Sequence, residues 1–165
     1  MRIRRKCYNK IPNRKQRKHR LLRSPFKCSF RRLALKKLSW YKKKTWESCS
    51  KYVRLLHSKD GYCICYTCGK VKPIKEIQAG HGFSGRHSSI LFELSILRPQ
   101  CFQCNCLNTG RLDIFTYKLR KELGDERYEE LWEQRNQNRQ YTIPELIELR
   151  ESFEQKFKEL QCQKQ

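Results

Sequence analysis

Two C-x2-C pairs limit most strongly what this chain can fold into. The first pair is Cys65 and Cys68, the second is Cys101 and Cys104, and 32 residues (69 to 100) separate them. Each pair is typical of a tight turn that directs two thiolates toward one ion, so the two turns predict a tetrahedral site for structural zinc. With four sulfur ligands, the ion would stabilise the fold and leave no position open for water.

The chain has ten cysteines in all. Its first residues are basic and lack the apolar segment of a secretory signal, so we expect a cytoplasmic protein whose thiols remain reduced. Reduced thiols favour metal binding over disulfides. Cys63 and Cys106 each lie two residues from a predicted ligand, and we interpret them as spare thiols beside the site. The alternative, that the cysteines are ordinary core residues, stays open at this point.

The formal net charge of +22 is concentrated at the N-terminal end. Residues 1–44 hold 19 of the 38 Lys and Arg and no acid, whereas residues 45–165 hold the other 19 against all 16 Asp and Glu. Cations at this density repel one another unless a polyanion neutralises them, which predicts a disordered, nucleic-acid-binding arm over residues 1–32. A tail that serves only solubility or localisation is the alternative. A membrane partner is disfavoured because the arm has no sustained apolar face.

Helical periodicity flanks the cysteine-rich middle on both sides. Apolar residues recur every three or four positions over Leu33–His57, which predicts a basic amphipathic helix within residues 33–60, with a break near Ser39. Residues 125–165 predict two C-terminal helices. The second of these begins at Thr142, which is followed by a Pro in the first turn and by a Glu three residues on, the pattern of a capping box.

The middle of the chain, residues 61–124, is expected to form the zinc-stabilised core. Its residue pattern favours a β-hairpin of two strands, Val71–Ala79 and Ile90–Leu97, framed by the two cysteine pairs and followed by a helix. The fold class predicted from these elements is α+β.

A histidine between the cysteine pairs is the candidate for chemistry. His81 lies in the loop AGHGFSGRH, and Asn105 directly follows the second pair. In a ββα-metal site, a His at the end of the first strand activates water and a ligand from the following helix helps to hold a divalent cation on the phosphate. An imidazole suits the task because its ordinary pKa lies near neutrality. Taken alone, a His in a Gly-rich loop is more often structural.

Several of these segments resemble one known family. The stretches CYTCG, AGH followed by SGR, LFE and PQCFQCN are similar to the lambda-type NinG (Rap) recombination endonucleases, a branch of the HNH superfamily. The C-terminal stretches YKLRKELG and RQYTIPELIELRESFEQKFKEL match that family in character and order. The resemblance extends over residues 36–160.

The resemblance implies a metal-dependent DNA endonuclease of phage recombination, acting on branched DNA such as D-loops or junctions in the host cytoplasm. It implies a small zinc-stabilised ββα-metal (HNH) core with flanking helices and the basic arm. His81 would be the general base, Asn105 a ligand of catalytic Mg²⁺ or Mn²⁺, and the four paired cysteines the zinc ligands. Symmetric cutting of a junction needs two active sites and therefore suggests a homodimer.

Two departures from the family pattern bear on the cation. Gly80 stands where many HNH enzymes have an Asp ligand, and Gln78 occupies a place that is often acidic. Glu93 is the nearest match to the middle HNH position, where it would serve the metal or only fix the loop. A non-catalytic zinc-containing nucleic-acid-binding protein on an HNH scaffold is therefore the alternative function. A ribosome- or RNA-associated basic protein would fit the charge but not the AGH loop.

Further residues are candidates for contact with nucleic acid. Arg86 suits phosphate because its planar guanidinium can bind two oxygens, although a solvated surface position would explain it equally. Beside a cluster of aromatic residues lie three consecutive lysines, which we expect to contact the DNA backbone. The lysines are Lys42, Lys43 and Lys44, and the aromatic residues, which would stack on bases or dock the helix on the core, are Trp40, Tyr41 and Trp46.

Overall fold

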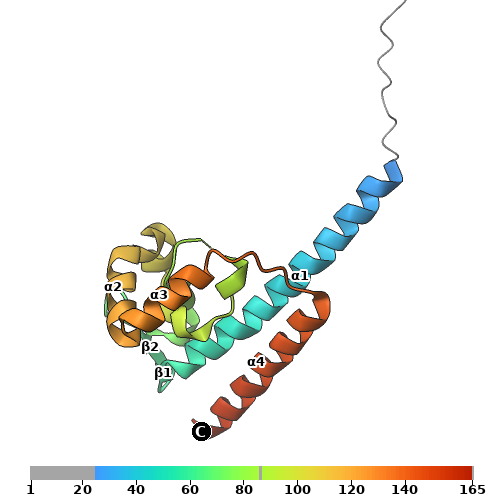
Figure 1. The fold of residues 1–165 in the computed structure, drawn as a ribbon. Coiled ribbons are helices and arrows are strands. Elements are labelled where there is room, and N and C mark those ends of the chain that lie inside the picture. Colours follow the sequence, from blue (N-terminus) through green and yellow to red (C-terminus); the bar gives the residue numbers. More distant parts are fainter. Residues whose placement is uncertain (1–24, 86, 165) are drawn as a thin grey trace, which may run out of the picture.

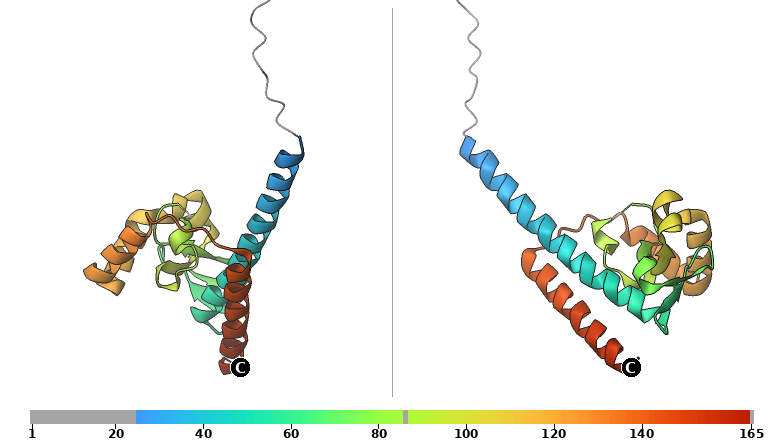
Figure 2. Two further views of the ribbon diagram at one scale, coloured as in Figure 1. Left: turned by 45° about the vertical axis from the view of Figure 1, so that its right-hand side comes forward. Right: turned by 180° about the vertical axis from the view of Figure 1, so that it is seen from behind.

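A long helix, α1 (Pro25–Leu56), organises the molecule in the computed structural model, which describes residues 25–85 and 87–164. Its N-terminal part extends away from the rest of the protein, while its C-terminal part lies between the other elements (Figures 1 and 2). The predicted break near Ser39 is wrong, and the helix begins at Pro25 instead of Leu33. No Gly or Pro interrupts the sequence between Pro25 and Leu56, and Pro is favoured in a first helical turn. The part of the predicted arm over residues 1–24 lies outside the described residues.

The last helix, α4 (Ile143–Gln163), lies alongside α1 and runs in the same direction (Figure 1). The predicted capping box is confirmed, since Thr142 and Glu145 exchange hydrogen bonds at the start of the helix. Near that start, the buried Thr45 hydroxyl of α1 donates to the carbonyl oxygen of Leu146 at 2.8 Å. At the other end, Lys164 Nζ donates to the carbonyl oxygen of Leu55 at 2.6 Å. Helix α4 is thus joined to α1 at both of its own ends.

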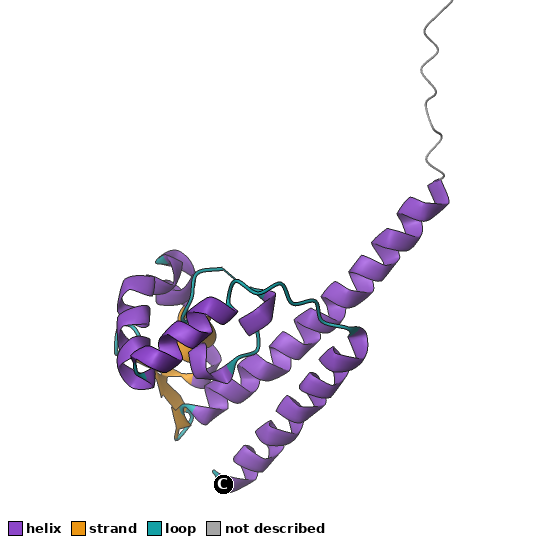
Figure 3. Ribbon diagram, in the orientation of Figure 1, coloured by secondary structure: helices purple, strands orange, loops and turns teal. Residues whose placement is uncertain are grey.

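The strands form two small antiparallel sheets beside the C-terminal end of α1 (Figure 3). One sheet contains β1 (Ser58–Lys59), β2 (Tyr62–Ile64) and β3 (Val71–Pro73). In the other, β4 (Ile77–His81) pairs with β5 (Leu97–Cys101). This second sheet is the hairpin that positions the candidate site.

The structure corrects both predicted strands. The segment Val71–Ala79 is divided between the two sheets, because the 3-10 turn η1 (Ile74–Glu76) follows Pro73. The segment Ile90–Leu97 is not a strand. It holds the 3-10 turns η2 (Ser88–Ile90) and η3 (Leu94–Ile96), and the second strand begins only at Leu97. These turns bury Ile90 and Ile96 without an alternating backbone, so an apolar run of this length was misread as a strand.

Helices and turns after the second strand complete the core. Two short irregular turns, η4 (Gln103–Leu107) and η5 (Thr109–Arg111), lead into α2 (Leu112–Leu123). Gly124, with φ +80°, separates α2 from α3 (Asp125–Gln134). The predicted α+β class is confirmed as a mixed structure of helices with small sheets. None of the helices in the described part of the chain combines the length and apolar character needed to cross a membrane.

We predict that Thr45→Val lowers the free energy of unfolding by about 1 kcal/mol, because it removes a buried hydrogen bond between α1 and α4 while preserving side-chain shape. Urea unfolding followed by circular dichroism measures the change. The control is Ser48→Ala, which removes an exposed hydroxyl contact to Glu154 between the same helices and should cost less. Equal costs for the two variants would contradict the role assigned to Thr45.

Candidate functional site

The two cysteine pairs meet in a four-sulfur cluster. The ligand atoms of Cys65, Cys68, Cys101 and Cys104 all lie within 4.8 Å of one another. Cys68 Sγ and Cys101 Sγ are 3.9 Å apart, close to the roughly 3.8 Å between two sulfurs of a tetrahedral zinc site with Zn–S bonds of about 2.3 Å. The sulfurs are not joined as disulfides. The donor set and spacing therefore fit one structural zinc ion.

Hydrogen bonds prepare this cluster for a cation. Burial alone would raise the pKa of Cys65, but hydrogen bonds from the backbone amides of Cys101 and Cys68 to its sulfur outweigh burial and lower that pKa to about 6. Burial raises the pKa of Cys101 to about 12, and the neighbouring thiols add to the rise. One thiolate among crowded sulfurs is the arrangement that a dication would stabilise, since its charge offsets the repulsion between thiolates.

The cysteines interpreted as spare lie outside the cluster. Cys63 is buried and its Sγ donates to the carbonyl oxygen of Arg54 at 3.3 Å. Cys106 is exposed, and its Sγ donates to Gln78 Oε1 at 3.2 Å. Within the described residues, the four paired cysteines form the only group of three or more His, Cys, Asp or Glu side chains close enough to share one ion.

His81 ends strand β4 and is half-buried against helix α1. Its imidazole stacks on the Trp46 indole with 4.6 Å between ring centroids and 18° between ring planes. Its Nε2 lies 3.1 Å from the carbonyl oxygen of Leu91. A carbonyl oxygen can only accept, so Nε2 carries the hydrogen and, in the neutral ring, Nδ1 is the basic nitrogen. These contacts fix both the orientation and the tautomer of the ring.

Asn105 lies on the other face of the hairpin. Its Nδ2 donates to Gln78 Oε1 at 2.7 Å. Because side chains alternate along a strand, Gln78 and His81 project to opposite faces of β4. The described contacts therefore join Asn105 to Gln78 and His81 to α1, and none links the two predicted catalytic residues. Their joint action at one phosphate stays a prediction.

Gln100 occupies the space that a side chain at position 80 would need. A Cβ built on Gly80 would lie 2.0 Å from Gln100 Oε1, far inside van der Waals contact. Gln100 is completely buried, and its Nε2 donates to Thr67 Oγ1 at 3.1 Å and to the carbonyl oxygen of Gly110 at 2.7 Å. The space beside Gly80, where the resemblance implied an acidic ligand, is thus filled by Gln100.

The remaining candidates have varied surroundings. Glu93 caps the turn η3, where its carboxylate accepts from the backbone N–H and the hydroxyl of Ser95. Lys42 Nζ lies over the Tyr141 ring, 5.8 Å from its centroid. Lys43 is exposed, whereas Lys44 forms an ion pair with Glu47 at 2.8 Å. Arg86 lies outside the described residues.

The sequence did not reveal what holds His81. The sequence predicts that Trp46 either stacks on bases or docks α1 on the core. Its helical spacing from Cys49 and Val53 is the signal that it faces inward. The Leu91 carbonyl left no signal, because a backbone acceptor is independent of residue type.

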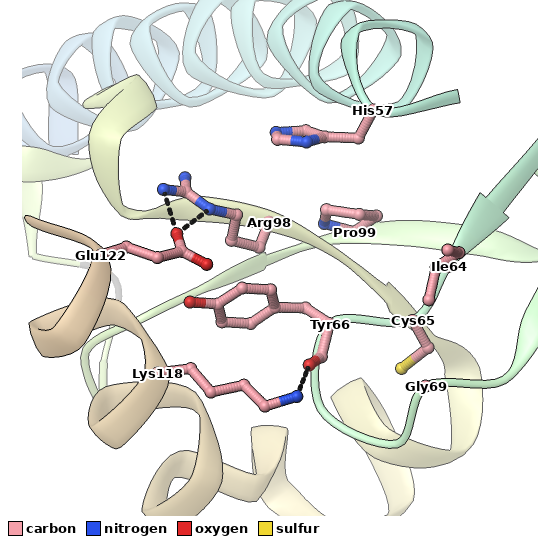
Figure 4. A pocket seen from close by; sticks show the side chains of 9 residues that line it. All are labelled: His57, Ile64, Cys65, Tyr66, Gly69, Arg98, Pro99, Lys118 and Glu122. Atoms are coloured by element: carbon pink, nitrogen blue, oxygen red, sulfur yellow. Dashed lines mark hydrogen bonds and ion pairs between the residues drawn. The ribbon is translucent and has the colours of Figure 1, made fainter. Parts of the chain in front are cut away.

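A pocket of about 470 Å³ lies beside the first cysteine turn, away from these His81 contacts (Figure 4). Its cationic groups are engaged with the protein. Arg98 Nη2 forms an ion pair with Glu122 at 2.9 Å, and Lys118 Nζ donates to the carbonyl oxygen of Tyr66 at 2.8 Å. These contacts join β5 and the first cysteine turn to α2, so we assign the pocket a structural role.

Comparison with known proteins places the chain in a family. The family described as Bacteriophage Lambda NinG protein matches residues 2–163. The chain belongs to the NinG family. No curated protein and no solved structure matches it. The match extends over nearly the whole NinG chain and supports the resemblance that its cysteine pairs, AGH loop and C-terminal segments suggested.

We predict that this NinG-family chain binds one zinc ion through the cysteine cluster. Cys104→Ser should lose the ion and unfold at lower temperature, because one of four thiolate ligands is removed. Metal content by atomic absorption and thermal unfolding by circular dichroism measure both effects. Cys106→Ser is the matched control, since the same change is made two positions on at an exposed thiol. Zinc retained by Cys104→Ser, or lost by Cys106→Ser, would refute the ligand assignment.

Proposed function

We propose that this NinG-family protein is a DNA endonuclease of phage recombination that hydrolyses phosphodiesters in branched DNA, such as D-loops or junctions, in the host cytoplasm. Three observations support the proposal: the family, the net charge of +22, and the setting of His81. The observation that carries it is the contact between His81 Nε2 and the Leu91 carbonyl oxygen. This contact selects the tautomer in which Nδ1 can accept a proton.

The proposed chemistry begins at this imidazole. His81 Nδ1 takes a proton from a water molecule, the resulting hydroxide attacks phosphorus, and the bond from phosphorus to the leaving oxygen breaks. The leaving oxygen takes a proton from solvent, and His81 returns its proton to solvent. The stacked Trp46 indole would stabilise the positive charge that the ring carries between these proton transfers.

The described residues do not fit a resident Mg²⁺ or Mn²⁺ ion. Hard divalent cations prefer carboxylate ligands, whereas the groups on the predicted metal side are the amides of Gln78 and Asn105, which bind each other. Glu93 is engaged in capping η3. The proposed steps therefore involve no ion held by the protein alone. If cleavage requires Mg²⁺ or Mn²⁺, we expect the ion to enter with the DNA phosphate.

The position of the Gln100 side chain favours a second candidate function. With Gln100 in the space of an acidic ligand, the protein would be a non-catalytic, zinc-containing nucleic-acid-binding protein that retains the scaffold. The two functions differ in one measurable property, the breaking of phosphodiester bonds. For cleavage of symmetric junctions, we further infer a homodimer that supplies two active sites.

We predict that the purified protein cuts four-way junction or D-loop DNA, and that His81→Ala reduces the rate about 10²- to 10⁴-fold, the range for loss of a general base. Cleavage is followed on gels with labelled linear duplex, D-loop and junction DNA, each with Mg²⁺, Mn²⁺ or a chelator. Binding is measured in parallel by fluorescence anisotropy. His57→Ala is the control, because His57 lines the pocket beside the first cysteine turn, together with Arg98 and Glu122.

The outcomes separate the candidates. If the wild-type protein binds DNA tightly and cuts nothing under any of these conditions, the endonuclease proposal fails and the non-catalytic function replaces it. If wild type and His81→Ala cut at equal rates, His81 is not the general base. Zinc content and thermal unfolding of each variant exclude loss of the fold as the cause.

A further inference from the structure

The connection between α3 and α4 contrasts in charge with the helices that it joins. Residues 134–144 contain no Asp or Glu, although acids are frequent in both flanking helices. Within this connection, the segment 135–140, which we call the polar loop, consists of two arginines and four carboxamides. Its residues 136–140 are all exposed. The polar loop therefore presents hydrogen-bond donors and positive charge and has no carboxylate of its own; the first acid after it, Glu145, is engaged with Thr142 at the start of α4.

Both ends of the polar loop are anchored to the segment that orients His81. At the first end, Ser89 Oγ donates to the carbonyl oxygen of Arg135 at 3.0 Å. At the second end, the buried Tyr141 packs edge-to-face on Phe92, with 5.3 Å between ring centroids. Leu91, whose carbonyl binds His81, lies between Ser89 and Phe92. The loop is thereby held next to the proposed base.

Two cationic side chains lie over the ring of Tyr141, the residue that anchors the second end of the loop. The Arg139 guanidinium lies 4.7 Å from its ring centroid and Lys42 Nζ of α1 lies 5.8 Å away. The connection passes from α3 across to the start of α4 beside α1 (Figure 3), which is how a loop residue and an α1 residue reach the same ring. Neither cation forms an ion pair with a carboxylate in the described part of the chain, in contrast to Lys44.

These groups have the chemistry that recognises DNA. An Arg and a Lys without carboxylate partners bind phosphate, and releasing the counterions of each phosphate contributes to affinity. Exposed Asn and Gln side chains can both donate and accept, as base edges require. Bases whose edges are unpaired or accessible occur where strands separate at a branch.

We propose that the polar loop and Lys42 form a DNA-contacting surface beside His81, in which Lys42 and Arg139 bind phosphates and the loop carboxamides bind base edges next to a branch point. This inference rests on the proposed function for its choice of substrate. It adds a surface that positions the DNA strand, formed jointly by the α3–α4 connection and α1.

The test measures binding in the full-length chain carrying His81→Ala, so that cleavage does not interfere. Fluorescence anisotropy gives Kd for a four-way junction and for linear duplex over a series of salt concentrations. The variant Lys42→Gln with Arg139→Gln should weaken binding at least tenfold and reduce the slope of log Kd against log salt by about two, since two phosphate contacts are removed. The matched control is Lys75→Gln with Lys158→Gln, which removes two exposed cations without carboxylate partners from other surfaces of the described chain.

A second variant tests the carboxamides without changing charge. Asn136→Ser with Asn138→Ser should leave the salt slope unchanged and reduce the preference for junction over duplex several-fold. The proposal is overturned if the Lys42 and Arg139 variant binds like its control, or if the Asn variant retains the full preference. These failures differ from failure of the proposed function, which appears as DNA bound normally by the active chain but not cut.

Discussion

The cluster of four sulfurs is the constraint on which the position of the candidate site depends. Cys101 is both a member of the cluster and the last residue of β5, opposite Ile77 at the start of β4. Fixing that end of the hairpin sets the register in which His81 pairs with Leu97 at the other end. A core this small, with its strands limited to a few residues, gains much of its order from such a fixed point, because short antiparallel pairs are only marginally stable alone.

Helix α1 packs against the hairpin on one side and against α4 on the other. Two consecutive residues show how: Thr45 donates to α4, and Trp46 stacks on His81. Adjacent helical residues point about 100° apart, so one turn of α1 can contact two different partners. The same helix carries Lys42, one turn earlier than Trp46, to the Tyr141 ring. Helix α1 therefore contacts the candidate base, the C-terminal helix and the proposed DNA surface, and fixes their positions relative to one another.

Features that depend on which side chains are present and on their spacing could be predicted from the sequence. The cysteine spacing predicted the four-sulfur cluster, and the Thr142 and Glu145 pattern predicted the start of α4. The second strand was misplaced because the apolar run before Leu97 is compatible with a strand and with buried 3-10 turns alike, and only tertiary packing selects between them. The orientation of His81 could not be predicted, since it depends on a backbone carbonyl ten residues away and on a helix from outside the loop.

The absence of a side chain at position 80 and the burial of Gln100 are physically coupled. Any side chain at position 80 would have to displace Gln100 Oε1, yet the Gln100 amide is held by Thr67 in the first cysteine turn and by the Gly110 carbonyl. Displacing it would leave buried polar groups unpaired beside the cysteine cluster, at a cost of about 1–3 kcal/mol for each group. Gly80 is thus the residue that lets the hairpin pack on the cysteine turn. A side chain that could bind a cation at position 80 would therefore also require a smaller neighbour at position 100. The setting of His81, on the opposite face, is independent of this packing.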